Sequence, residues 1–324
     1  PNLSEPTTIG DLLLPEETAT AEEAYRTGIH MLQYRDPKGE PAAYFRRALE
    51  LDETHIPARI ALAEIFIHRK EYAAAEEYLL TAEKMLTLWN RRPESGKVFY
   101  LLGCCAEAME RYAQAREWYW QAAVLSDTVN CAYTRIAAMD GMLEDWDVMA
   151  DDAGYAAARF PDNLSARLYE AIADSMLGNS DKAKEKILAV QKTDPLFHPA
   201  SWAAVQLGLL TEEDFWNGLH SSPTQTCVDL YEEFSSVGME SWDEALLKAC
   251  IRRQKADAIV YFLLGRTPET PVGRTFPFRL CEKKALERMK DNADARYLLG
   301  CLLYNDRQYP DAVRLWKTVD TPEA

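Results

Sequence analysis

The chain has 324 residues, of which 48% are apolar and 27% are charged, so a large core is possible and disorder is not expected. It holds 36 Lys and Arg against 52 Asp and Glu, giving a formal net charge of −16. This charge disfavours general binding to phosphate backbones or anionic membranes, so we expect neither nucleic acid nor a membrane as a partner. The low glycine count of 14 argues against an all-β protein. No apolar run reaches the length of about 18 residues that a membrane span requires.

The chain begins at Pro1 rather than at a Met, and no basic stretch precedes an apolar one. We therefore expect a processed N-terminus and no signal peptide. The cysteines are odd in number and form no C-x-x-C motif, which disfavours a disulfide framework and predicts reduced thiols in a cytoplasmic protein. They are Cys104, Cys105, Cys131, Cys227, Cys250, Cys281 and Cys301.

A repeated pattern of small and large residues is clearest from Ile56 to Ala82. Small residues stand at positions eight and twenty of this unit, where two helices can cross closely only if their side chains are small. Larger residues surround the crossing and fill the space towards the next pair. The spacing is that of a tetratricopeptide helix–turn–helix. The residues that carry it are Leu62, Ala63, Phe66, Tyr72, Ala75, Leu79 and Ala82.

Further copies of the unit follow, two of them at the bare period of 34 residues and both ending in proline, at Pro161 and Pro195. We therefore predict an all-α fold, a right-handed superhelix of stacked helix–turn–helix pairs forming one continuous solenoid. We assign a linker to 1–18, tetratricopeptide repeats to 19–195, degenerate helical pairs to 196–292 and a final repeat to 293–324. The small residue at position eight of the successive copies is Gly28, Ala63, Gly103, Ala137, Ala171 and Gly300.

The segment 196–292 departs from this period, but its apolar residues still recur at helical spacing. Five Pro and Gly residues in Gly265–Pro277 predict a loop there. We expect no sheet. The predicted helices are Ser201–Leu210, Glu212–Leu219, Thr226–Val237, Trp242–Gln254, Ala256–Leu264 and Phe278–Lys290.

Several short motifs stand out along the chain. They are Gly28 followed by His30 and Gln33-Tyr34-Arg35, then Asp194-Pro195-Leu196, Phe276-Pro277-Phe278-Arg279 and Arg296-Tyr297-Leu298-Leu299-Gly300. These motifs resemble the helical C-terminal half of bacterial proteins that bear the domain of unknown function 5107. The resemblance covers about residues 20–318, with departures at Met31-Leu32 and Trp89–Gly96. It implies a large β-rich domain upstream of this chain. It implies no catalytic residues.

No motif for catalysis, metal or cofactor binding stands out. The histidines form no H-E-x-x-H or similar spacing, and no phosphate-binding loop, G-x-G-x-x-G or G-x-S-x-G occurs. His68 and Glu64 could pair on one helix face, but a surface ion pair is the simpler reading. We predict no catalytic residue, no metal and no cofactor. The five histidines are His30, His55, His68, His198 and His220.

Ligands of tetratricopeptide superhelices usually bind on the concave face, which the first helix of each pair lines at positions two, five, nine, twelve and thirteen. The Lys and Asn that clamp a C-terminal carboxylate in chaperone-binding relatives are missing here at positions five and nine. The face is instead fairly apolar and suits an extended apolar segment, a partner helix or a docked domain. Its candidate residues are Tyr25, Ile29, Gln33, Ile60, Glu64, His68, Lys97, Tyr100, Thr134, Met142, Leu168, Met176, Tyr297 and Tyr304.

The sequence thus predicts an interaction scaffold without catalysis of its own, which binds a protein partner or its own upstream β-domain. The alternative is that this chain is the accessory helical half of a carbohydrate-active enzyme. Self-association through the last repeat, which has no polar capping helix, is a third possibility. The segment 248–290 carries eleven Lys and Arg against four Asp and Glu, and could dock an acidic surface.

Overall fold

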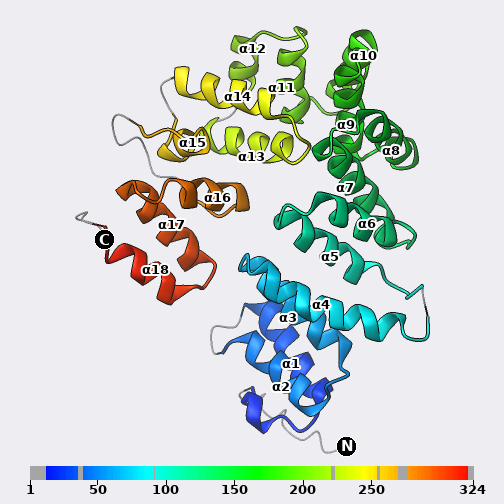
Figure 1. Ribbon diagram of the computed structural model, residues 1–324, viewed down its shortest axis with the longest axis vertical. Coiled ribbons are helices and arrows are strands. Elements are labelled where there is room, and N and C mark those ends of the chain that lie inside the picture. Colours follow the sequence, from blue (N-terminus) through cyan, green and yellow to red (C-terminus); the bar gives the residue numbers. More distant parts are fainter. Residues whose placement is uncertain are drawn as a thin grey trace, which may run out of the picture. The chain divides into compact units, whose positions relative to one another are not determined.

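The computed structural model describes residues 12–35, 39–90, 92–219, 223–253, 256–268 and 276–319 (Figure 1). All regular structure in these ranges is helical, so the predicted all-α solenoid class is confirmed. Each helix predicted in 196–292 is present, and its ends lie within a few residues of the predicted ones. His220 and the middle of the loop predicted at 265–277 lie outside the described residues. No helix in these ranges combines the length and the apolar composition that a bilayer span requires.

Packing between helices divides the chain into two units, 1–93 and 94–324. The first unit contains a short 3-10 turn and four helices. They are η1 (Pro15–Glu17), α1 (Ala21–Tyr34), α2 (Pro41–Leu51), α3 (Ile56–His68) and α4 (Tyr72–Thr87). The predicted linker 1–18 therefore contains η1, and its residues 1–11 lie outside the described part.

The second unit begins with three complete repeats and continues with shorter helices. The repeats are α5 (Lys97–Ala108) with α6 (Tyr112–Ala123), α7 (Val129–Met142) with α8 (Trp146–Arg159), and α9 (Leu164–Met176) with α10 (Ser180–Thr193). The shorter helices are α11 (His198–Gln206), α12 (Glu212–Gly218), α13 (Pro223–Ser235), α14 (Glu240–Arg252), α15 (Ala258–Leu263) and α16 (Leu280–Arg288). The last pair is α17 (Ala293–Asn305) with α18 (Tyr309–Trp316).

The turn inside each repeat has one conformation that recurs at position fifteen. Lys70, Glu110, Glu144, Gly178 and Arg307 all adopt positive φ, between 57° and 80°. In each case the next residue donates its N–H to the carbonyl five residues back, as Glu71 does to Phe66 at 2.8 Å. This left-handed residue ends the first helix and satisfies one of its last carbonyls. Only one of the five is Gly, so the turn leaves little trace in the sequence.

Position eight is where the two helices of a pair approach most closely. A Cβ added to Gly28 would lie 2.6 Å from the ring of Phe45, and one added to Gly103 would lie 2.5 Å from the ring of Tyr119. A Cβ on Gly300 would lie 2.3 Å from the indole of Trp316. A large aromatic ring of the second helix therefore packs directly on the backbone of the first. This contact explains why the sequence keeps position eight small.

We expect Gly103→Ala to lower the free energy of unfolding by about 1–3 kcal/mol, because the fully buried ring of Tyr119 must move or the helices must separate. Urea unfolding followed by circular dichroism measures the change. Gly218→Ala is the matched control, since nothing lies within 4 Å of a Cβ at that helical position. Equal effects of the two substitutions would contradict the proposed role of the close crossing.

Candidate functional site

In the first unit, the face predicted to bind a partner is formed by α1 and α3. We call it the α1–α3 face and define it by positions five, nine, twelve and thirteen of the two helices. The start of α3 contacts α1, because the His55 ring lies 5.2 Å from that of Tyr25 and its Nε2 lies 3.3 Å from a Glu22 carboxylate oxygen. The face is accessible: Leu32 is 44% exposed, and Gln33 and His68 are exposed. Its residues are Tyr25, Ile29, Leu32, Gln33, Ile60, Glu64, Ile67 and His68.

In the second unit, Glu107 of α5 stands at a corresponding position, twelve, and belongs to a closed polar network with side chains of α6 and α7. Glu107 is ion-paired with Arg135 and accepts a hydrogen bond of 2.6 Å from the Tyr119 hydroxyl. The Tyr100 ring lies 5.4 Å from that of Tyr119. Burial raises the pKa of Cys104 to about 11 and raises that of Tyr100 as well, so both stay protonated at neutral pH. The network is satisfied internally and offers a partner little unpaired charge.

Other predicted groove residues of the second unit are held in packing contacts. The Thr134 hydroxyl accepts a hydrogen bond of 2.7 Å from the side-chain amide of Asn163, and Met142 is half-buried against the core. Lys97 and Met176 are exposed. The carbonyl of Tyr297 accepts a hydrogen bond of 3.1 Å from the Trp316 indole. The sequence thus places these residues on the first helices but does not show which side chains contact them.

The prediction that Leu168 lies on an accessible face is wrong, because its side chain is fully buried. Ile172 and Ala138, at position nine of α9 and α7, are also fully buried. Helices that follow the repeats return to this region. A Cβ on Gly141 of α7 would lie 2.6 Å from the carbonyl oxygen of Val237, just after α13. These positions of the first-helix face of α7 and α9 are therefore part of the core of the second unit.

Two polar contacts accompany this return. Tyr169 of α9 interacts with Glu233 and Ser236, and burial together with the nearby Glu233 carboxylate raises its pKa. Lys284 of α16 donates to Glu110, in the turn between α5 and α6, at 2.7 Å. Both contacts join residues far apart in the sequence, so the periodic pattern could not reveal them. The second unit thus covers part of its own first-helix face with its later helices.

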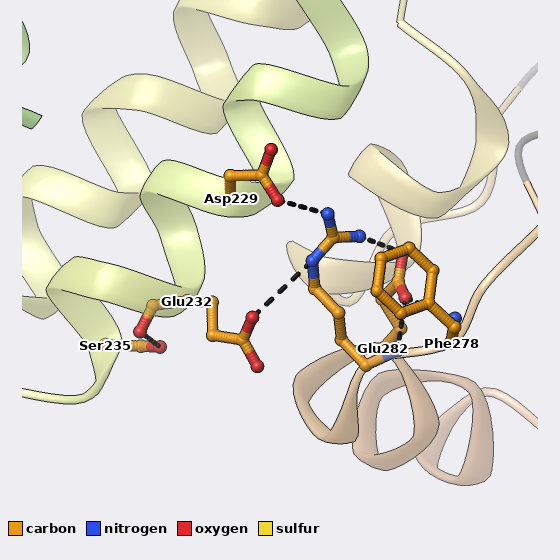
Figure 2. Close-up of polar contacts among 6 residues, drawn as sticks. Asp229, Glu232, Ser235, Phe278 and Glu282 are labelled. Atoms are coloured by element: carbon orange, nitrogen blue, oxygen red, sulfur yellow. Dashed lines mark hydrogen bonds and ion pairs between the residues drawn. The ribbon is translucent and has the colours of Figure 1, made fainter. Parts of the chain in front are cut away.

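Arg279 is the last residue of the motif Phe276-Pro277-Phe278-Arg279. Its side chain links α16 to α13 through ion pairs. Its guanidinium is ion-paired with Asp229 and Glu232 of α13 and with Glu282 of α16, whose carboxylates surround it in Figure 2. The Phe278 ring covers the guanidinium, with its centroid 4.1 Å from Cζ. Glu282, fully buried, also accepts the backbone N–H groups of Phe278 and Arg279 at 2.7 and 2.8 Å and so caps α16.

We expect Arg279→Leu to lower the free energy of unfolding of the second unit by about 3–5 kcal/mol, because the Glu282 carboxylate would be left buried without a cation. Arg314→Leu is the control, since Arg314 is 77% exposed in its pair with Asp311. That pair should contribute at most about 1 kcal/mol. Urea unfolding of both variants provides the comparison, and a small effect at Arg279 would contradict the fastening role.

A second buried charged group joins α6, α7 and α8. The Asp140 carboxylate is fully buried, with one oxygen 2.6 Å from Arg116 Nε, and neither oxygen has a hydrogen bond of good geometry. Burial raises the pKa of Asp140 to about 7, with Arg116 opposing this rise and Asp152 adding to it. The pKa of Asp152 is also raised, chiefly by burial. The pair therefore holds a proton in the folded state at a pH where unfolded aspartates have lost theirs.

This pair sets the sign of a pH dependence. Between about pH 4 and pH 7 this pair binds more protons in the folded chain than in the unfolded one, so its contribution to the free energy of unfolding falls as the pH rises through this window. The buried Asp243, whose pKa burial raises to about 9, adds a slope of the same sign. Asp140→Asn should therefore reduce the slope without abolishing it, whereas Asp291→Asn, at an exposed position, should leave it unchanged. Unfolding by urea at a series of pH values tests this, and a variant at Asp140 with the original slope would refute the assignment.

Among the described residues, no group of three His, Cys, Asp or Glu side chains is placed to hold a metal ion. No family model matches the chain, so the resemblance to proteins with the domain of unknown function 5107 stays a prediction. Solved structures match well. YrrB, described as a TPR protein with an unusual peptide-binding site, is 17% identical with a TM-score of 0.50, and the match covers 59% of this chain and 92% of YrrB.

Two further structures match over nearly the whole chain. A tetratricopeptide repeat protein from Parabacteroides merdae is 13% identical with a TM-score of 0.51, and the match covers 91% of this chain and 98% of that one. The C-terminal part of a TPR repeat-containing protein from Cytophaga hutchinsonii is 11% identical with a TM-score of 0.50, with 91% and 93% covered. The chain therefore has the fold of tetratricopeptide-repeat proteins.

Proposed function

We propose that the chain is a protein-interaction scaffold that binds a segment of a partner protein on the α1–α3 face. One observation carries this proposal. At positions nine and five of this face, Ile29 and Ile60 are half-buried, whereas Ile172 and Leu168 at the same positions of α9 are fully buried. The first unit therefore keeps partly open a face whose counterpart in the second unit is covered at these positions by that unit's own helices. The peptide-binding site described for YrrB is an analogy in the same direction.

The side chains of the α1–α3 face suit an apolar segment with polar edges. Ile29, Ile60 and Ile67 are half-buried and present part of their apolar surface, and Leu32 extends it. Gln33 and His68 provide exposed polar groups beside them. Apolar anchors surrounded by polar groups are typical of faces that hold a helix or an extended peptide. An upstream β-rich domain of the same protein is the alternative occupant, and in both cases the chain has no catalytic role.

The location belongs to the same proposal. The structure holds the seven cysteines as thiols, and three of them are fully or almost fully buried. Reduced thiols are typical of the cytoplasm, where we expect the scaffold to act.

We expect Leu32→Glu to weaken peptide binding about tenfold, or by about 1.4 kcal/mol, because it places a charge among the apolar anchors. A phage-displayed library of random linear peptides, selected on the full chain, supplies the probes. Leu51→Glu is the matched control, since Leu51 is the last residue of α2, is 37% exposed and is not one of the residues of this face. Isothermal titration of the selected peptides measures both variants.

Circular dichroism must show that the two variants keep the helical content of the parent chain. Selected peptides that bind Leu32→Glu as tightly as the parent chain would contradict the assignment of the α1–α3 face. Failure of the library to yield any binding sequence would contradict the peptide-binding function itself.

A further inference from the structure

Two depressions adjoin on the surface of α8, α9 and α10, within the second unit and apart from the α1–α3 face. The larger has a volume of 470 Å³ and lies between the second half of α8, the first turns of α9 and the second half of α10. The smaller has a volume of 380 Å³ and lies beside Asn130, at the start of α7, and Asn163, before α9. Pro161 lines both, so the two form one continuous surface.

Small side chains open the larger depression. Gly154, Ala157 and Ala158 of α8 and Ala189 of α10 line it and project little beyond the backbone. A Cβ on Gly154 would lie 3.3 Å from a carboxylate oxygen of Glu170, so any larger residue there would narrow the space. The floor is apolar and of a size to take one or two small apolar side chains.

The charged groups around the two depressions are unequally paired. Lys186 is ion-paired with Glu170 at 2.8 Å and with Asp174, so its charge is balanced. In the described part of the chain, neither Arg159 nor Arg167 has a carboxylate partner. Arg159 lies 5.8 Å from the centroid of the Phe160 ring, and Arg167 donates to the Thr193 hydroxyl at 3.0 Å.

This arrangement is unusual for so acidic a chain, which holds 52 Asp and Glu against 36 Lys and Arg. Besides Glu170, the one carboxylate that lines either depression is Asp162. The lining therefore carries three cations and two anions, and one unpaired arginine lines each of the two depressions that share Pro161. Arginine guanidinium groups bind carboxylates with two parallel hydrogen bonds, which gives both strength and geometry.

We propose that the joined depressions bind an acidic peptide segment of a partner protein, with carboxylates on Arg159 and Arg167 and a small apolar side chain on the alanine floor. The site goes beyond the scaffold function assigned to the α1–α3 face and uses none of its residues. The −16 net charge of the chain disfavours a nucleic acid at the same place, because a polyanion would be repelled along most of the surface.

The probes are fluorescein-labelled peptides that combine Asp or Glu with Ala, Val or Leu in every order, together with their Lys-containing counterparts and a single-stranded oligonucleotide. Fluorescence anisotropy with the full chain measures binding. We expect acidic peptides to bind, with affinity falling as salt rises. The double variant Arg159→Ala/Arg167→Ala should weaken binding about tenfold or more.

Two controls isolate the site. Lys182→Ala removes an exposed cation of α10 that lines neither depression, and it should leave the affinity unchanged. Ala158→Trp fills the larger depression from an exposed position and should weaken peptides that carry an apolar residue.

Three results would overturn the proposal. The first is that acidic and Lys-containing peptides bind equally well, or that neither binds. The second is an unchanged affinity for acidic peptides in the double arginine variant. The third is that the chain prefers the oligonucleotide to the peptides and that this preference depends on the same two arginines.

Discussion

The close crossing of two helices in each pair is the contact on which the rest of this structure depends. Where Gly28, Gly103 or Gly300 stands, an aromatic ring of the second helix rests directly on the backbone of the first. Such contacts fix the separation of the helices, and the separation fixes which side chains point between pairs and which point outward. The residue at position fifteen then adopts the same left-handed conformation in successive repeats, so the chain reverses direction in the same way each time.

The two units use this geometry differently. In the first, the side chains of the first helices remain partly exposed, as Leu32 is. In the second, the helices after α10 pack back on α7 and α9, with the backbones at Gly141 and Val237 in close approach. The same face of the repeat is thus partly exposed in one unit and part of the core in the other. The difference comes from what the rest of the chain covers and not from the repeat itself.

Buried charge accompanies this covering. Arg279 is surrounded by three carboxylates and an aromatic ring, and Glu107 neutralises Arg135. Buried ion pairs add little net stability, but they are costly to break one partner at a time, so they fix the partners of each helix. The same reasoning makes the unpaired Arg159 and Arg167 notable. No carboxylate in the described part of the chain is paired with either of them, although the chain carries a net charge of −16.

The sequence by itself determined the helical class, the repeat and nearly all helix positions, because the small residue at position eight and the apolar spacing are local requirements of the pair. It also placed the candidate residues on the first helices. Only the tertiary structure decided that Tyr25 and Ile60 lie on an accessible face while Leu168 is buried. Burial at these positions depends on contacts between residues such as Gly141 and Val237, far apart in the sequence, and periodicity carries no information about such contacts.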